Sequence, residues 1–273
     1  MPDLDALATI TAEAEEADGA APLDAAAWRA LRHRPDSVRS RVDDDGFALL
    51  IGTELGLVVR PAARGHGLGG RLLGEALAAY GAGPLSAWSH GDHPAAARLA
   101  QRHGFDRVRS LWVMRRAAAL PLPELVVPDG LTIRGYTPAD ADEVIRVNAA
   151  AFAHHPEQGA MDATELAERM AEPWFDPAGL LLGRDGDRLA AFHWTKQHSA
   201  DLGEVYVVGV DPAAQGRGLG KVMTLAGLHH LARLGVDEIL LYVESDNAPA
   251  VAVYSGLGFT HADADTHVMY RRG

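Results

Sequence analysis

Residues 205–223, VYVVGVDPAAQGRGLGKVM, are the part of the sequence that decides the fold. The near-continuous β-prone run GEVYVVGV (203–210) predicts a buried central strand, which ends at Asp211-Pro212. Apolar residues then recur at helical spacing and predict a helix over 219–234. Between strand and helix lies the glycine-rich segment Gln215-Gly216-Arg217-Gly218-Leu219-Gly220. The stretch therefore predicts a strand, a glycine loop and a helix in succession.

The glycine loop has the chemistry of an anion site. Glycines tolerate positive φ and let backbone N–H groups approach a ligand closely, and a helix N-terminus carries partial positive charge. Both features suit a phosphate or pyrophosphate. The loop fits neither a Walker loop nor the dinucleotide pattern Gly-x-Gly-x-x-Gly. The alternative interpretation is a tight turn from strand to helix without a ligand.

The same pattern occurs earlier in the chain. LGLVVRPAARGHGLGGRLL (55–73) is followed by HPAAARLAQRHGFDRV (93–108), as 205–223 is followed by NAPAVAVYSGLGFTHA (247–262). Val59 aligns with Val210, and Gly104-Phe105 aligns with Gly258-Phe259. This repetition predicts a duplicated domain. We expect one copy over residues 1–117, a proline-rich linker over 118–130 and the second copy over 131–273.

The second copy alternates between strand and helix patterns. We predict strands at 131–137, 189–195, 203–210, 238–245 and 266–272, and helices at 139–152, 164–172, 219–234 and 249–257. The predicted fold class is α/β of the mixed α+β kind, with helices on both faces of a mixed sheet in each copy.

Composition excludes several kinds of function. The 273 residues include no cysteine, which excludes disulfides, cysteine thiolate nucleophiles and Cys-based zinc sites. The formal charge of -12 disfavours binding to nucleic acid or to an anionic membrane. The acidic N-terminal segment lacks the features of a secretion signal, and no apolar run is long enough to span a membrane. We expect a cytoplasmic monomer that uses no metal.

Gln/Arg-x-x-Gly-x-Gly after a valine-rich strand resembles the acyl-CoA motif of the GCN5-related N-acetyltransferases. The resemblance implies two tandem domains of this family, each with a mixed, mostly antiparallel sheet flanked by helices, and acetyl-CoA as co-substrate. It implies that the cofactor-binding residues of the second copy are Val208, Gly209, Val210, Gln215, Gly216, Arg217, Gly218, Leu219, Gly220, Lys221, Asn247, Ala248, Pro249, Ala250, Val251 and Ala252. The matching residues of the first copy are Leu57, Val58, Val59, Gly65, His66, Gly67, Leu68, Gly69 and Gly70.

Longer segments of the sequence make the resemblance specific to one subgroup of the family. HPEQG (155–159), FHWTK (192–196) and LLYVESDN (240–247) resemble a tandem subgroup that acetylates the cysteinyl amine of a cysteinyl-glucosaminyl-inositol. This small-molecule amine is the implied partner. The substrate-binding residues implied are Asp24, Glu157, Lys196, Glu204 and Tyr242. Ala25 is an alternative to Asp24, and ordinary surface charge is the alternative interpretation of Glu157 and Lys196.

Comparison of the two copies assigns the chemistry to the second. Glu204 aligns with Thr53, Asn247 with His93 and Tyr254 with Ala100, although a slip of one residue would pair Glu204 with Glu54. We therefore interpret the first copy as degenerate, either still binding acetyl-CoA or serving as structure.

We assign two catalytic residues, Glu204 and Tyr254. Glu204 at the start of the central strand would take the amine proton, directly or through water, and Tyr254 would donate to the leaving thiolate. The backbone N–H of Val210 would stabilise charge on the thioester oxygen. The alternatives are a solvated glutamate at a strand edge and a packed helix aromatic. Other possible functions are acetylation of another small-molecule or peptide amine, or acyl-CoA binding without catalysis.

Overall fold

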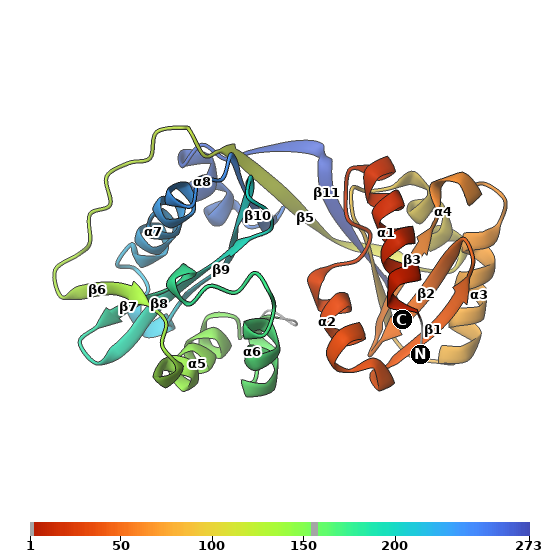
Figure 1. The fold of residues 1–273 in the computed structure, drawn as a ribbon, viewed down its shortest axis with the longest axis horizontal. Coiled ribbons are helices and arrows are strands. Elements are labelled where there is room, and N and C mark those ends of the chain that lie inside the picture. The colour runs from red at the N-terminus through yellow and green to blue at the C-terminus, as the bar shows by residue number, and fades with distance from the viewer. Residues whose placement is uncertain (1–2, 154–157) are drawn as a thin grey trace. The chain divides into compact units, whose positions relative to one another are not determined.

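The computed structural model describes residues 3–153 and 158–273, which form two compact units (Figure 1). The first unit contains the residues up to 113 together with 244–246 and 262–273. The second contains 114–243 and 247–261. Within the described residues, no helix is both long enough and apolar enough to cross a membrane.

The first unit is a sheet with two helices on each face. Its elements are α1 (Leu4–Asp18), α2 (Ala25–His33), β1 (Val38–Asp43), β2 (Gly46–Ile51), β3 (Glu54–Val59), α3 (Leu68–Tyr80), β4 (Leu85–Ser89), α4 (Pro94–Arg102), most of β5 (Asp106–Ala117) and most of β11 (Thr260–Arg272). The strand order is β1-β2-β3-β4-β11-β5. The first three strands are antiparallel, and β4 runs parallel to β3.

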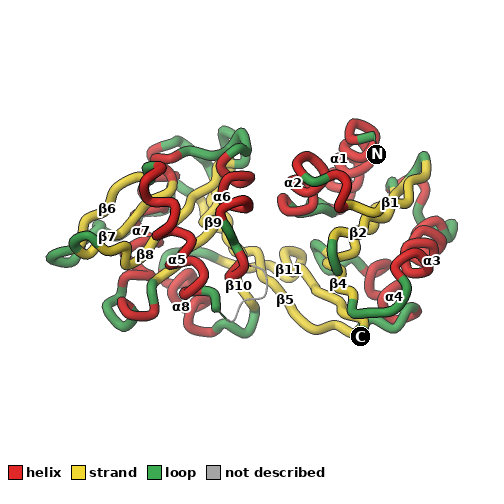
Figure 2. The backbone as a smooth tube through the Cα atoms, turned by 90° about the horizontal axis from the view of Figure 1, so that it is seen from below, coloured by secondary structure: helices red, strands yellow, loops and turns green. Residues whose placement is uncertain are grey.

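Alternation of side chains along β2 builds both layers of this unit. Phe47 and Leu49 pack with α1 and α2, whereas Ala48 and Leu50 pack with α3 and α4. Successive residues of a strand point to opposite faces, so a strand that is apolar throughout is buried on both sides. Figure 2 shows the two helix pairs on opposite sides of the strands.

The second unit repeats this plan. Its elements are β6 (Leu131–Gly135), α5 (Ala141–Ala151), α6 (Ala163–Met170), β7 (Leu180–Asp185), β8 (Arg188–Gln197), β9 (Leu202–Val210), α7 (Leu219–Arg233), β10 (Glu238–Glu244) and α8 (Ala248–Gly256), with the ends of β5 and β11. The order is β11-β5-β10-β9-β8-β7-β6. Strands β6 to β9 are antiparallel, and β10 is parallel to β9.

Two apolar layers cover the two faces of the second sheet. Phe192, Trp194 and Val207 pack with α5 and α6, while Ala191 packs on the opposite face with α7. Helix α7 lies very close to the sheet at Gly227, where an added Cβ would come within 2.0 Å of the His193 ring. This close approach fixes the position of α7 on the sheet. It thereby also fixes the position of the glycine loop that leads into the helix.

The predicted fold class is confirmed, and the predicted elements of the second copy are present with ends shifted by a few residues. One strand, β7, was not predicted. The compact units also differ from the predicted segments 1–117 and 131–273 at the end of the chain. Residues 268–272 of β11 pair with 85–89 of β4, so 262–273 belong to the first unit. The closing strand of the second sequence copy thus completes the sheet of the first.

Candidate active site

A β-bulge interrupts the central strand β9 of the second unit. Thr195 on β8 faces Val205 and Trp194 faces Val207, which leaves Tyr206 as the extra residue. Strand β10 pairs with β9 only over 202–205, and this pairing ends next to the bulge although β10 itself continues to Glu244. A bulge bends its strand and increases the local twist. In the second unit, the separation of β9 from β10 after Val205 thus coincides with the bulge.

Beyond the bulge, β9 turns backbone polar groups toward the side that β10 has left. The N–H of Asp211 donates to the carbonyl oxygen of Ala190 on β8, at 2.9 Å. Partners across an antiparallel pair alternate, so Gly209 also faces β8, while Val208 and Val210 present their N–H and C=O groups on the opposite edge. Such an edge can pair with an extended amide chain. Val208, Gly209 and Val210 are among the residues predicted to bind the cofactor.

The glycine loop follows directly. Gly216 and Gly218 have φ of 79° and 74°, and Gly218 is the N-cap of α7. An added Cβ at either would meet nothing within 4 Å, so the left-handed backbone is what requires glycine there. The first N–H groups of α7 have no intrahelical acceptor. The turn therefore offers convergent N–H donors and the positive helix end, which fit a diphosphate.

A group of polar side chains surrounds the start of β9. Glu204 is buried, with 4 % of its surface exposed, and lies opposite Lys196 of β8 in the strand register. The Oε2 atom of Glu204 is 2.6 Å from Nε2 of His198. The ammonium of Lys196 lies 5.2 Å from the centre of the Trp174 ring and 5.6 Å from that of Tyr206. The structure thus brings together two predicted residues, Glu204 and Lys196.

His198 was missed by the sequence analysis. It follows the end of β8 and is two residues from Lys196, and residues two apart on an extended chain share a face. This spacing was the available signal. The sequence pattern alone did not show that the chain turns back there and brings Glu204 opposite that face.

The other predicted catalytic residue, Tyr254, lies on α8. Its ring packs edge-on against Phe259, with ring centres 6.0 Å apart. Burial raises the pKa of the Tyr254 phenol above its usual value. Asn247 is the N-cap of the same helix, and its Oδ1 accepts a hydrogen bond from the N–H of Ala250 at 3.2 Å. Asn247 therefore has a structural role in starting α8.

The remaining predicted substrate residues are spread over the chain. Tyr242 on β10 is 41 % exposed. Asp24 belongs to the first unit, where its Oδ1 caps α2 by accepting from the N–H of Ala27 at 2.7 Å. Glu157 lies outside the described residues. Among the residues that the structure does describe, no group of three or more His, Asp or Glu side chains could hold a metal ion.

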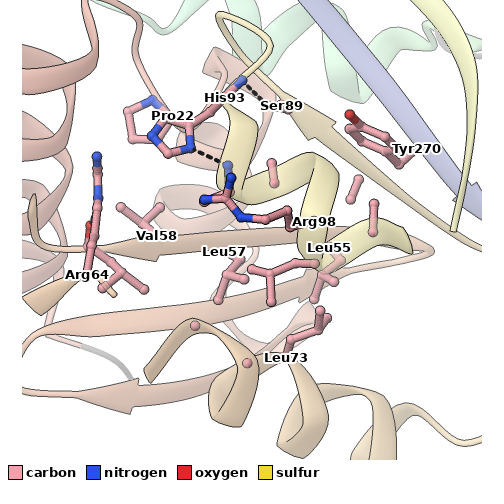
Figure 3. Close-up of a pocket in the computed structure, with 18 of the residues that line it drawn as sticks. Pro22, Leu55, Leu57, Val58, Arg64, Leu73, Ser89, His93, Arg98 and Tyr270 are labelled. Atoms are coloured by element: carbon pink, nitrogen blue, oxygen red, sulfur yellow. Dashed lines mark hydrogen bonds between the residues drawn. The ribbon is translucent and has the colours of Figure 1, made fainter. Parts of the chain in front are cut away.

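The first unit contains a cavity of about 490 Å³ at its own glycine loop. Its lining comes from β3, the loop, α3, β4 and α4, and Figure 3 shows Leu55 and Leu57 of β3 among the lining side chains. The N–H of Arg60 donates to the carbonyl oxygen of Asp45 at 2.8 Å, so the same alternation turns Leu57 and Val59 toward the side of β4. Strand β4 pairs with β3 at a single position.

Arginine occupies the loop position of Gln215 in this unit. The guanidinium of Arg64 donates to both carboxylate oxygens of Asp18, at 2.6 and 2.8 Å, and to the carbonyl oxygen of Val59 at 3.0 Å. The Val59 carbonyl on the cavity edge is thus already hydrogen bonded within the protein. Gly65 and Gly67 have φ of 81° and 90°, as their counterparts do.

The central strands of the two units differ in one respect. The register of β2 with β3 is continuous from Gly46–Val59 to Ile51–Glu54, so β3 has no bulge. Because β9 contains the extra residue Tyr206, counting back from the aligned Val59 and Val210 pairs Glu204 with Glu54. The strand pairing supports the same match, because Glu204 pairs with the parallel strand β10 and Glu54 pairs with the parallel strand β4. The alignment of Glu204 with Thr53 was therefore wrong by one residue.

Comparisons with known proteins agree with this architecture. The model of the Acetyltransferase (GNAT) family matches residues 30–105 and 148–259. The chain is 66 % identical to a mycothiol acetyltransferase of Nocardioides sp. (strain ATCC BAA-499 / JS614), over 98 % of this chain and 97 % of the relative. It is 49 % identical to a mycothiol acetyltransferase of Nocardia farcinica, over 96 % and 92 % of the two chains.

Solved structures share the tandem fold. A tandem GNAT protein from the clavulanic acid biosynthesis pathway superposes with a TM-score of 0.74 at 19 % identity, covering 98 % of this chain and 94 % of the other. A GCN5-related N-acetyltransferase from Sphaerobacter thermophilus gives 0.67 at 22 % identity, covering 98 % and 91 %. With the full-length identities, these matches establish that the chain belongs to the GNAT acetyltransferase family and, within it, to the mycothiol acetyltransferases.

Proposed function

We propose that the second unit transfers the acetyl group of acetyl-CoA to the cysteinyl amine of a cysteinyl-glucosaminyl-inositol, which yields mycothiol. The observation that carries this proposal is the buried carboxylate of Glu204 at the point where β9 and β10 separate. The similarity to mycothiol acetyltransferases over almost the whole chain supports the choice of product. We further propose that the enzyme is a cytoplasmic monomer.

Acetyl-CoA would be held by backbone atoms more than by side chains. The N–H groups of 215–220 would bind the diphosphate, and Lys221 in the first turn of α7 would add positive charge. The edge of β9 at 208–210 would pair with the pantetheine amides. Residues 247–252 at the start of α8 would line its other side. The bound thioester supplies an activated acetyl group.

Side chains of the protein would then transfer two protons, and a backbone N–H group would stabilise one developing charge. An α-amine has a pKa of about 8, so part of it is already the neutral nucleophile near neutral pH, and Glu204 would take the proton that this neutral amine loses as the amide forms. The N–H of Val210 would donate to the thioester oxygen while the C–N bond forms. Tyr254 would give its proton to the sulfur as the C–S bond breaks. Its raised pKa keeps the phenol protonated until then.

The acceptor would be bound by charged and phenolic side chains suited to hydroxyl groups. We assign Lys196 and Tyr242 of the second unit to this role, with Asp24 and Glu157 as the further candidates from the sequence. We propose that the first unit binds a second acetyl-CoA in its cavity without transferring its acetyl group, because Tyr254 has only Ala100 as its counterpart.

Replacing Tyr254 tests the general acid. We expect Tyr254→Phe to lower kcat at least about a hundredfold, with little change in KM for acetyl-CoA, because phenylalanine keeps the packing on Phe259. Burial raises the phenol's pKa, so in the wild type kcat should show no loss from Tyr254 deprotonation below about pH 10. Steady-state assays from pH 6 to 10 measure both.

Tyr136→Phe is the matched control, because Tyr136 is a buried tyrosine of the same unit that packs with α5 and α6 instead. It should leave kcat unchanged. An unaltered kcat in Tyr254→Phe would remove the phenol from the mechanism.

The proposed function itself is tested with purified protein, acetyl-CoA and a panel of amines, following release of free CoA thiol. We expect the cysteinyl pseudo-disaccharide to give the highest kcat/KM, because Lys196 and Tyr242 provide contacts for its hydroxyl groups. A preference for an aminoglycoside or a peptide N-terminus would overturn the acceptor and leave the transferase class in place. Failure to release CoA with any amine would favour acyl-CoA binding without catalysis.

A further inference from the structure

The proposed base Glu204 has a short side-chain contact with His198. Nε2 of His198 lies 2.6 Å from Oε2 of Glu204. The side chain of Glu204 is 6 % exposed, while that of His198 is 31 % exposed. The imidazole therefore stands between a buried carboxylate and the solvent, at hydrogen-bond distance from one of its two oxygens.

The turn between β8 and β9 holds His198 in this place. The N–H of His198 donates to the carbonyl oxygen of Leu202 at 2.9 Å. The hydroxyl oxygen of Ser199 accepts from the N–H groups of Asp201 and Leu202, at 3.2 and 3.1 Å. Backbone and side-chain hydrogen bonds thus fix the turn on which the ring is mounted. The position of the imidazole is set by the same hairpin that carries Glu204.

A buried carboxylate needs a hydrogen-bonding partner. Removing an ionised carboxylate from water is costly unless it is paired and hydrogen bonded. Lys196 lies opposite Glu204 in the strand register, and its ammonium lies over the rings of Trp174 and Tyr206. A lysine is also a flexible point charge, whereas an imidazole N–H is directional. His198 is therefore suited to fix the orientation of the carboxylate as well as its charge.

We propose that His198 is the positioning residue of the general base. Its Nε2–H donates to Oε2 of Glu204 and holds the carboxylate so that Oε1 receives the proton of the acceptor amine. The proton moves from nitrogen to Oε1, and His198 keeps its own proton throughout. This inference rests on the proposed function, since it gives His198 a role only if Glu204 acts as the base.

Three substitutions at His198 distinguish a positioning role of its side chain from a purely structural role. We expect His198→Ala to lower kcat about ten- to a hundredfold while KM for acetyl-CoA stays the same, because the glycine loop is untouched. His198→Gln should recover most of the lost kcat, since its Nε2–H can reach the place of the imidazole Nε2–H. His198→Asn should recover little, because its amide is one methylene too short. Each kcat is measured with acetyl-CoA and the cysteinyl pseudo-disaccharide.

A double-substitution cycle distinguishes the failure of this inference from failure of the proposed function. Adding His198→Ala to Glu204→Gln should cause no further loss, because residues that act as one unit are not additive. If Glu204→Gln lowers kcat and His198→Ala does not, or if Gln and Ala at 198 are equally impaired, His198 has no positioning role. If Glu204→Gln itself leaves kcat unchanged, the base assignment fails first.

His229→Ala is the matched control for loss of an imidazole. His229 lies on α7, and its Nε2 is 3.0 Å from the carbonyl oxygen of Pro123 in the segment before β6. It has no part in the proposed chemistry, so kcat should be unchanged. Thermal unfolding of every variant shows whether a lower kcat comes from a smaller folded fraction.

Discussion

Replacing Glu204 with glutamine is expected to lower kcat about 10²- to 10⁴-fold, the usual contribution of a positioned general base. Glutamine has the same shape as glutamate but cannot take the amine proton. The neutral amide also removes the charge that we expect His198 and Lys196 to compensate. KM for acetyl-CoA should change little, because the proposed diphosphate site at 215–220 follows the other end of β9. Steady-state release of CoA thiol measures both constants.

Glu238→Gln is a suitable control for this experiment. Glu238 begins β10, next to the same strand, but pairs with Arg115 at 2.7 Å near the surface. Exposed ion pairs contribute little, so its removal should leave kcat intact. If Glu204→Gln retained the wild-type kcat, water alone would suffice as the base and our mechanism would be wrong.

Replacing Gly218 with aspartate should weaken acetyl-CoA binding about a hundredfold, which corresponds to roughly 2.7 kcal/mol. Gly218 is the N-cap of α7 and has φ of 74°. Aspartate tolerates this backbone better than most residues, and nothing lies within 4 Å of its added Cβ. Its carboxylate, however, would occupy the anion site and repel a diphosphate. The rise in KM for acetyl-CoA is the quantity to measure.

Gly235→Asp controls for strain and added charge. Gly235 follows the opposite end of α7, has φ of 82° and also has nothing within 4 Å of its added Cβ. A carboxylate is less favourable at a helix C-terminus than at an N-terminus, so this variant should lose at least as much stability. It should nevertheless keep the wild-type KM. Equal rises in KM in both variants would contradict a diphosphate site at 215–220.

Local patterns predicted much of this structure from the sequence. The run 203–210 is apolar on both faces and became β9, and the glycine loop and helix pattern became the start of α7. The repeat of this unit at 55–73 predicted β3 and α3 in the same arrangement. These features depend on residues close together in the chain, where periodicity and turn chemistry are most informative.

Features set by pairing between distant strands were not predictable in this way. The bulge at Tyr206 depends on the register with β8, and it moves the counterpart of Glu204 from Thr53 to Glu54. The exchange of 262–273 into the first unit depends on the affinity of β11 for β4. The sequence of a strand indicates that it will pair with another strand. It does not indicate which strand that partner will be.

The candidate site shows the same division. Glu204, Lys196 and Tyr242 came from the resemblance to a known family, whereas His198 emerged only when the hairpin placed it beside Glu204. The Arg64–Asp18 pair in the first unit joins residues that are 46 positions apart. No local pattern indicates such a contact.

The claim that the second unit alone carries out the transfer is tested most directly by kcat in the pair Glu54→Gln and Glu204→Gln. The two carboxylates hold equivalent strand positions, and only β9 has the bulge. We expect Glu54→Gln to turn over like the wild type and Glu204→Gln to be almost inactive. A loss of kcat confined to Glu54→Gln, or equal in both variants, would contradict a single catalytic unit at Glu204.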